Sequence, residues 1–218
     1  MSGPCIIVGY GPGIGGAVAR AFGREGMSLG LVARNAAKLD AAVAELEAAG
    51  HAAAAFPADA GDAASLSAAL SAAQDRFGAA DVLVYNAATW RSGPVLATAP
   101  AELDADFRIC VTGALTAARA VAPAMQTRGH GSLLFTSGGF ALHPNPIAPT
   151  LSIGKAGLRA LVLMLAQELA PAGVRVGMVT VMGRVQPGTE FDPDSIAASF
   201  LALHHGTPDP ATAEHRFG

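Results

Sequence analysis

The sequence predicts an α/β protein in which helices cover both faces of one parallel sheet. Short apolar runs alternate with longer segments of helical period, a glycine-rich turn follows the first run, and the composition is 51% hydrophobic and 14% charged. Continuous apolar strands separated by helices indicate a parallel sheet, because each crossover needs a helix to return. The expected fold class is therefore a doubly wound, Rossmann-type parallel sheet in three α/β/α layers, forming a single domain over residues 1–218.

The expected elements follow the chain in order. Apolar, β-rich runs predict strands at 5–8, 29–33, 53–56, 82–85, 132–136 and 174–181. Helical periodicity predicts helices at 14–24, 36–49, 63–77, about 104–128, about 152–170 and 196–203. Asn35 and Asp62 each precede a helix and can accept a hydrogen bond from a free first-turn N–H, so both are expected N-caps. A polar, Pro-rich stretch from Gly206 predicts a loop before a short last strand at 214–217.

Charge and cysteine content argue against several classes of partner. The net charge is -3 without a cluster of Lys or Arg, so neither nucleic acid nor an anionic membrane is an expected partner. No apolar run reaches the roughly 20 residues of a membrane span, and no basic leader opens the chain. The two cysteines, Cys5 and Cys110, are too few for a disulfide framework and suit a reducing compartment, so we expect a cytoplasmic protein. Burial as a small hydrophobe is the favoured interpretation of Cys110.

A glycine-rich turn lies directly between the first expected strand and the first expected helix. Glycines there permit a tight turn, let the backbone approach a pyrophosphate, and leave helix N–H groups pointing at it. The alternative is a glycine-rich turn without a ligand. The residues expected at the nucleotide are Gly9, Gly11, Gly13, Ile14 and Gly15.

Arg34 bears on the choice between the two nicotinamide dinucleotides. NAD-binding units place an acidic residue about 20 residues after the glycine turn, at the end of the second strand, to hold the ribose hydroxyls. Arg34 stands there in this chain. A guanidinium can pair with a 2′-phosphate that a carboxylate would repel, so NADP(H) is favoured over NAD(H). The alternative is a solvated loop cation.

These motifs resemble, over almost the full chain, those of the short-chain dehydrogenase/reductase family. The matching residues, in order, are Gly9, Gly13 and Gly15, Asp59, Asn86-Ala87-Ala88, Lys155, and Met182-Gly183. The resemblance implies that Asp59 contacts the adenine, that Asn86 and Ala87 border the cofactor, and that Lys155 binds the nicotinamide ribose. Gly183 matches the glycine that follows the family's sixth strand.

The same resemblance shows that the family's active site is altered. The family uses an Asn, a Ser, a Tyr and the Lys, but the first three positions here are Cys110, Gly138 and Leu151. The longer Tyr-to-Lys spacing of related enoyl reductases fails too, because Ala148 occupies that position. Carbonyl reduction needs an acid within hydrogen-bond reach of the oxygen, and leucine cannot serve.

Several groups could replace the missing acid. Lys155 is retained, and the candidate donors beside it are Ser137 and His143, with Thr150, Ser152 and an ordered water as further alternatives. His143 suits the chemistry because its unperturbed pKa lies near neutrality, although a solvated loop histidine is the more common case. The adjacent pair His204 and His205 has no accompanying ligand set, so no metal site is expected.

Two further expectations concern the cleft and the assembly. Only residues 184–191 separate the Gly183 turn from the next helical pattern, so the substrate lid is expected to be short. The helices near 107–124 and 158–169 are apolar around much of their circumference, and the family resemblance implies a homodimer or homotetramer built on them.

The sequence supports two hypotheses of function. The first is an NADP(H)-dependent oxidoreductase of the short-chain type that acts on a small-molecule carbonyl, alcohol or activated alkene, with Lys155 retained and an altered proton donor. The second is a catalytically silent NADP(H)-binding or sensing protein, because three active-site positions are changed together.

Overall fold

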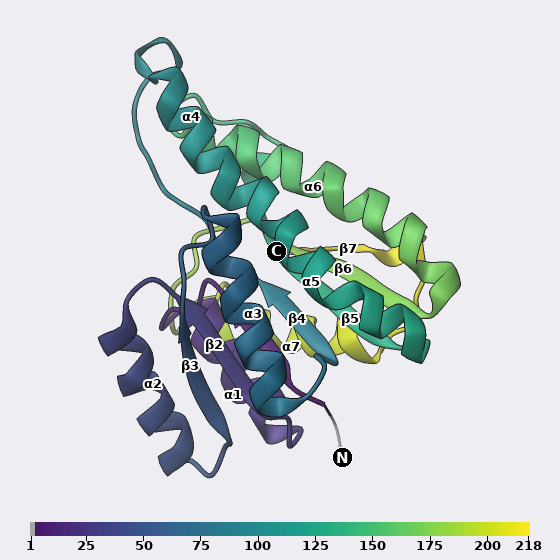
Figure 1. The fold of residues 1–218 in the computed structure, drawn as a ribbon. Helices are drawn as coiled ribbons and strands as arrows, with labels where there is room; N and C mark the ends of the chain where they lie inside the picture. Colours follow the sequence, from purple (N-terminus) through teal and green to yellow (C-terminus); the bar gives the residue numbers. More distant parts are fainter. Residues whose placement is uncertain (1–2) are drawn as a thin grey trace.

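The computed structural model describes residues 3–218 and contains one seven-stranded sheet in the order β3-β2-β1-β4-β5-β6-β7. All neighbouring strands pair in parallel, as the sequence predicted. The switch between β1 and β4 makes the sheet doubly wound (Figure 1). The strands are β1 (Cys5–Val8), β2 (Leu29–Ala33), β3 (Ala53–Pro57), β4 (Val82–Tyr85), β5 (Gly131–Gly138), β6 (Val174–Val181) and β7 (Glu214–Phe217).

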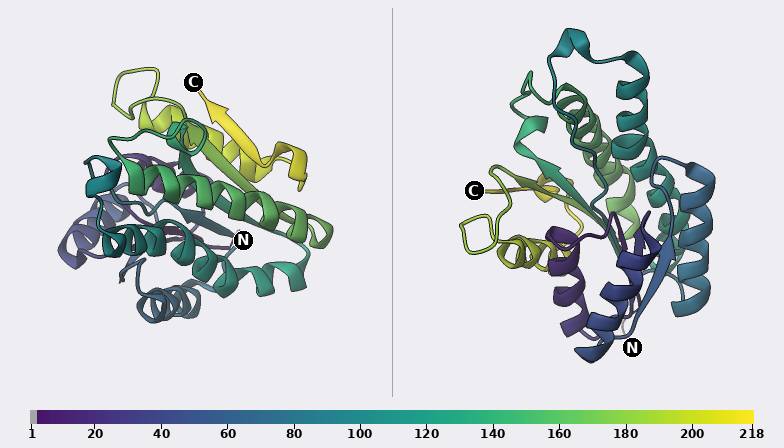
Figure 2. Two further views of the ribbon diagram at one scale, coloured as in Figure 1. Left: turned by 90° about the horizontal axis from the view of Figure 1, so that it is seen from above. Right: turned by 90° about the vertical axis from the view of Figure 1, so that its left-hand side faces the viewer.

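Helices cover both faces of this sheet (Figure 2). One face carries α1 (Ile14–Arg24), α2 (Ala36–Ala48) and α7 (Pro193–His205). The other face carries α3 (Ala63–Phe77), α5 (Gly113–Arg128) and α6 (Pro149–Leu169), while α4 (Pro100–Phe107) packs on α6. Short 3-10 turns occupy Val95–Ala97, Gly139–Ala141, Ala170–Ala172 and Pro210–Thr212. The result is the expected three-layer α/β/α arrangement.

Local chemistry explains where the helices begin. Asn35 accepts a hydrogen bond from the Lys38 amide at 3.0 Å, and Asp62 accepts from the Ala64 amide at 2.9 Å, which confirms both predicted N-caps. The predicted last strand is also present as β7. It is attached to α6 by a bidentate contact, in which Arg159 donates to the Glu214 carboxylate at 2.7 and 3.0 Å.

The helix expected at 104–128 is present but is not a regular α-helix throughout. It begins earlier, at Pro100, and a π-helical turn over Arg108–Thr112 separates α4 from α5. The prediction missed this turn because apolar periodicity does not register one extra residue in a helix. The turn lies beside α6 and therefore shapes the site described below.

Among the described residues, one helix is long and apolar enough to cross a membrane by length and composition. This segment, Pro149–Ala172, has a mean hydropathy of 1.3, and half of its most apolar stretch is buried inside the structure. It covers β6 and packs on α4. These contacts are those of a core helix.

The connection from β6 to α7 contains no helix. Its last ring, Phe191, packs on the Gly183 turn, where an added Cβ would lie 2.2 Å from that ring. The same ring meets Phe217 of β7 in an edge-on contact with centroids 6.1 Å apart. The connection is therefore folded back against the end of the sheet.

Candidate cofactor and substrate site

Two clefts open at the carboxyl edge of the sheet, where ligands of doubly wound folds bind. The first, of about 390 Å³, is lined by the ends of β1 to β4 and includes Gly9, Arg34 and Asp59. The second, of about 830 Å³, is lined by the ends of β5 and β6 and by α6. Asn86 and Ala88 line both clefts, so the two adjoin at the end of β4.

The turn after β1 can be formed only with glycine at its first position. Gly9 has a φ of +82°, and an added Cβ would lie 2.3 Å from the Ala87 backbone nitrogen. The Asn86 side-chain amide donates to the Gly9 carbonyl at 2.9 Å. Asn86 and Ala87, predicted to border the nucleotide, therefore also fix the turn against the end of β4.

The rest of the turn leaves room for a phosphate. A Cβ added at Gly11 or at Gly13 would meet no atom within 4 Å, so both glycines face open space. Gly15, in contrast, lies close to the Tyr10 backbone, and Ile14 reaches the second cleft. Helix α1 has no side-chain cap and no acidic residue in its first turn. Its free N–H groups and dipole suit an anion, so the residues present fit a pyrophosphate.

Arg34 and Asp59 both line the first cleft, at the ends of the neighbouring strands β2 and β3. Within residues 3–218, the Arg34 side chain is exposed and makes no hydrogen bond or ion pair with the protein. One Asp59 carboxylate oxygen accepts a hydrogen bond from the Gly61 amide at 2.8 Å. The cleft therefore presents an available guanidinium at the end of β2 and a positioned carboxylate at the end of β3.

Lys155 is buried at the base of the second cleft. Its Nζ donates to the Thr136 carbonyl at 2.7 Å, which joins α6 to the end of β5. Burial lowers the pKa of the Lys155 ammonium, and the neighbouring Cys110 opposes that shift. A buried lysine with a lowered pKa is a stronger acid than an exposed one.

Cys110 is fully buried, in agreement with its interpretation as a small hydrophobe. It lies in the π-helical turn and packs on Gly154 of α6, where an added Cβ would lie 2.9 Å from the Cys110 sulfur. Burial raises the pKa of its thiol, although Lys155 and the Thr89 amide act in the opposite direction. The thiol therefore remains protonated near neutral pH.

The two candidate proton donors, Ser137 and His143, lie in different environments. Ser137 is buried in the second cleft, and its hydroxyl has no hydrogen-bond partner within the described chain. Alternation along β5 places it on the face of Leu133 and Phe135, which is the face covered by α6. Exposed His143, in contrast, is not among the residues that line this cleft.

The residues on either side of Leu151, where the resemblance predicts a tyrosine, have different surroundings. Ser152 makes hydrogen bonds at the start of α6. Its hydroxyl donates to the Ala148 carbonyl at 2.9 Å and accepts from the Asn145 amide. Thr150 is fully buried and lines a separate cavity of about 340 Å³ beside Arg91 and Glu102. Leu151 does line the second cleft, as does Gly183.

Sequence reasoning missed two aromatic residues of the second cleft. Trp90 follows the Asn86 turn in an irregular segment, and Phe140 lies in the 3-10 turn after β5. Neither belongs to a periodic element or to a recognised motif. The one available signal was that Trp90 is the only tryptophan in the chain and lies in a loop after a buried strand.

A doubly wound sheet with a glycine turn and an anion-ready helix end is the structure of a dinucleotide-binding protein. A family model described as short chain dehydrogenase matches residues 5–190. The chain therefore belongs to the short-chain dehydrogenase/reductase family, whose members are oxidoreductases that use a nicotinamide cofactor.

Named relatives support this assignment. A 2,3-dihydro-2,3-dihydroxybenzoate dehydrogenase of Bacillus subtilis is 32% identical over 80% of this chain and 67% of its own length. The oxidoreductase UcpA of Salmonella typhimurium is 33% identical over 80% of this chain and 66% of its own length. The chain thus spans about two thirds of the length of these curated relatives. The crystal structure of a metagenomic short-chain oxidoreductase in complex with NADP has a TM-score of 0.88 at 30% identity, covering 100% of this chain and 99% of that one.

Proposed function

We propose that the protein is an NADP(H)-dependent oxidoreductase acting on a carbonyl, alcohol or activated alkene, with Lys155 retained and Ser137 in place of the usual acid. The observation that carries the proposal is the buried, unpartnered Ser137 hydroxyl in the cleft that also contains Lys155. Buried hydroxyls nearly always find a partner, so we assign the missing partner of this hydroxyl to a ligand that would enter the cleft.

The cofactor would occupy both clefts. Its pyrophosphate would lie over Gly11 and Gly13 at the start of α1, and its adenosine end beside Asp59 in the first cleft. Arg34 would pair with a 2′-phosphate, which supports NADP(H) over NAD(H). The reactive end would lie by Lys155 in the second cleft, beyond Asn86. When bound, the reduced cofactor supplies a hydride to the substrate carbon.

The protein's own contribution is the proton. In carbonyl reduction, the substrate carbon gains the hydride and its oxygen gains a proton, so the product is an alcohol. The Ser137 hydroxyl would donate that proton. Water that enters the cleft would then return a proton to Ser137, because Ser137 and Lys155 make no hydrogen bond to each other within the described chain. The Lys155 ammonium would supply positive charge near the substrate oxygen.

The test combines cofactor binding with turnover. Purified protein should bind NADPH and oxidise it in the presence of at least one carbonyl compound from a panel. Ser137→Ala should reduce kcat by about 10²–10⁴-fold, the usual contribution of a positioned acid, with NADPH affinity unchanged. Ser71→Ala is the matched control, because Ser71 is an exposed serine of α3 outside both clefts. Equal activity of Ser137→Ala and the parent would exclude Ser137 as the donor.

A second candidate is a catalytically silent NADP(H)-binding or sensing protein. It is favoured by the joint replacement of the family's Asn, Ser and Tyr by Cys110, Gly138 and Leu151. An added Cβ at Gly138 would meet only the Val181 carbonyl, at 3.7 Å, so the Cβ of a serine fits there. The double substitution Leu151→Tyr with Gly138→Ser should then create turnover that the parent lacks. A fully active parent would exclude this candidate.

The proposal also covers the substrate lid at 184–191, the oligomeric state and the location in the cell. With no helix between β6 and α7, we propose a shortened lid and a cleft that stays open to solvent. Exposed apolar side chains on α4, α5 and α6 favour a homodimer or homotetramer. These side chains are Phe107, Leu115, Ile153 and Met164. Cys5 and Cys110 are buried and form no disulfide, which suits the cytoplasmic location that we propose.

A further inference from the structure

The second cleft is mainly apolar and contains no acidic group. Large apolar side chains form most of its wall: Ile14, Trp90, Phe140, Leu151, Val181 and Val185. Among its lining residues within the described chain, the only charged side chains are Lys155 and Arg184. Its volume of about 830 Å³ falls within the range of roughly 300–1,000 Å³ found for sites of drug-sized ligands. The apolar lining therefore favours a bulky apolar group beside the reactive end of the cofactor, which the proposed function places in the same cleft.

Two aromatic rings form one wall of this cleft. Trp90 and Phe140 have ring centroids 6.0 Å apart and planes tilted by 35°, so they contact each other. The Trp90 side chain nevertheless remains 62% exposed, which is unusual because tryptophan side chains are largely buried on average. Large exposed apolar surface beside a cleft marks a binding site, and a flat ring is the group that stacks best on an aromatic face.

The loop that carries Trp90 is fixed to α4 by its next residue. Arg91 Nε donates to an Asp106 carboxylate oxygen at 3.2 Å, and Arg91 Nη1 donates to Glu102 at 3.1 Å. Asp106 is almost fully buried, so this contact is shielded from solvent on one side. The aromatic wall is therefore anchored at Arg91, even though the Trp90 ring itself is exposed.

Leu151 adds alkyl surface to the same cleft. It comes from the first turn of α6, whereas Trp90 follows β4 and Phe140 follows β5. Three separate parts of the chain thus converge on one cleft with apolar side chains. A leucine at this position presents alkyl surface without a hydroxyl, which favours a substrate with a large apolar body over a small polar one.

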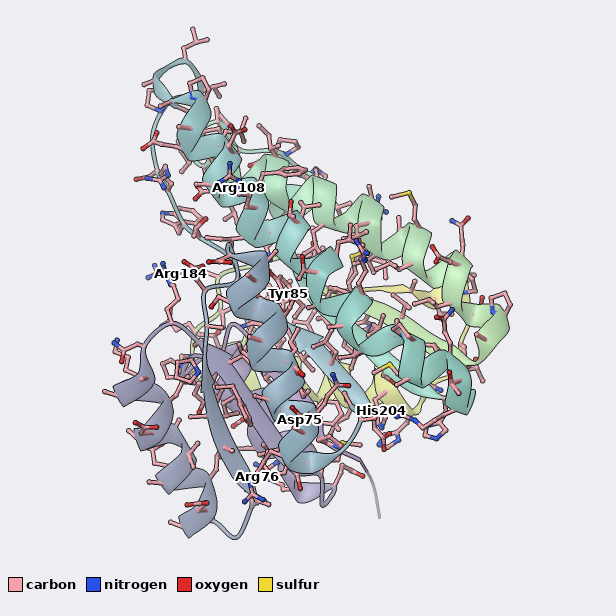
Figure 3. All side chains as sticks on the ribbon, viewed as in Figure 1. Asp75, Arg76, Tyr85, Arg108, Arg184 and His204 are labelled. Atoms are coloured by element: carbon pink, nitrogen blue, oxygen red, sulfur yellow. The ribbon has the colours of Figure 1, made fainter. Side chains whose placement is uncertain are left out.

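The charges select among such substrates. Lys155 lies at the base of the cleft, and Arg184 lies at its edge, where Figure 3 shows the side chain extending outward from the carboxyl end of the sheet. With two cations and no carboxylate in the lining, a cationic ligand would be repelled and a neutral or anionic one accepted.

Resting on the proposed function, we infer that the substrate is a flat aromatic carbonyl compound, neutral or carrying a carboxylate. Its ring system stacks on the Trp90 and Phe140 wall, and its carbonyl group lies toward Lys155 and Ser137. Reduction forms a C–H bond from the cofactor's hydride and an O–H bond from the protein's proton. The aromatic alcohol and the oxidised cofactor are released.

Binding is tested without turnover by calorimetry. 2-Naphthoate, which cannot be reduced at its carboxylate, is titrated into the NADP⁺-saturated protein, and 2-naphthylmethylammonium serves as the cation of similar shape. We expect 2-naphthoate to bind at least about tenfold more tightly than the cation. Trp90→Ala and Phe140→Ala should each weaken its binding about tenfold or more, because each removes a stacking surface. Leu96→Ala is the control: Leu96 is fully exposed in the 3-10 turn Val95–Ala97 and lies outside the cleft, so its Kd should stay within about twofold.

Turnover is measured separately, as the formation of 2-naphthalenemethanol from 2-naphthaldehyde and NADPH. Binding of 2-naphthoate without this product would retain the inferred ligand class and remove the proposed activity. Reduction of butanone by a protein that does not bind 2-naphthoate would retain the activity and overturn the inferred class. Equal binding of the cation, or an unchanged Kd in both aromatic variants, would also overturn it.

Discussion

Removing the hydroxyl of Tyr85 should destabilise the protein through one carbonyl in the π-helical turn. In a regular α-helix the Gly113 amide would donate to the carbonyl of Ile109, four residues earlier. Here it donates to the carbonyl of Arg108 instead, which leaves the Ile109 carbonyl without its helical donor. The Tyr85 hydroxyl, from the end of β4, donates to that carbonyl (Tyr85 and Arg108 are labelled in Figure 3).

The expected loss follows from the burial of this contact. Tyr85 is completely buried, so Tyr85→Phe removes the donor and water cannot easily replace it. A buried acceptor left without a partner costs about 1–3 kcal/mol. For a chain of this size, each kcal/mol corresponds to about 2–4 °C in Tm, so the expected decrease in Tm is roughly 2–12 °C.

Urea unfolding followed by circular dichroism measures the change, and Tyr10→Phe is the matched control. Tyr10 is the only other tyrosine, and its hydroxyl makes no hydrogen bond among the described residues. The control should differ from the parent by less than about 0.5 kcal/mol. If Tyr85→Phe unfolds at the same urea concentration as the parent, the Tyr85 hydroxyl does not support the turn, and the reasoning is wrong.

Three further predictions concern the nucleotide turn, the cofactor choice and the last strand. Gly11→Ala should leave the Tm unchanged but weaken NADPH binding at least about tenfold, because its Cβ meets no protein atom and enters the space assigned to phosphate; unchanged binding by calorimetry would mean that the turn is structural. Arg34→Ala should weaken NADPH binding about 10–100-fold and leave NADH binding unchanged, since a charge-assisted contact contributes about 1.5–3 kcal/mol; an equal loss for both would contradict a role at the 2′-phosphate. Hydrogen bonds from Arg159, opposed by burial, hold the pKa of Glu214 below its ordinary value of 4.5, so this carboxylate stabilises the fold above that pH and the stabilisation is lost as pH falls through the lowered pKa. Urea unfolding at pH 7 and pH 3 should therefore show a smaller pH dependence for Glu214→Gln than for the parent, and an identical dependence would contradict the assignment.

Sequence patterns predicted the sheet and its helices well where each element has a strong local cause. β1, β2 and β4 are short runs without a charged residue, and Asn35 and Asp62 cap helices as their side-chain chemistry predicts. The π-helical turn was missed because its cause is not local: Tyr85, more than twenty residues earlier, supplies the hydrogen bond that the turn needs. Trp90 was likewise not predicted to line the second cleft, because loop residues converge on a cleft only in the folded chain.

Cys110, at the position where the resemblance predicts an asparagine, packs against the helix that carries Lys155. Gly154 allows Cys110 to approach α6 closely, and an added Cβ there would lie 2.9 Å from the Cys110 sulfur. Asparagine is larger than cysteine, so restoring the family's residue at this position would require the π-helical turn and α6 to separate. Such a movement would displace Lys155, which follows Gly154 directly and is held by the Thr136 carbonyl. Cys110→Asn alone should therefore lower the urea concentration at which the protein unfolds, and an unchanged midpoint would contradict this packing argument. The substitutions Leu151→Tyr and Gly138→Ser are therefore best made while Cys110 is kept.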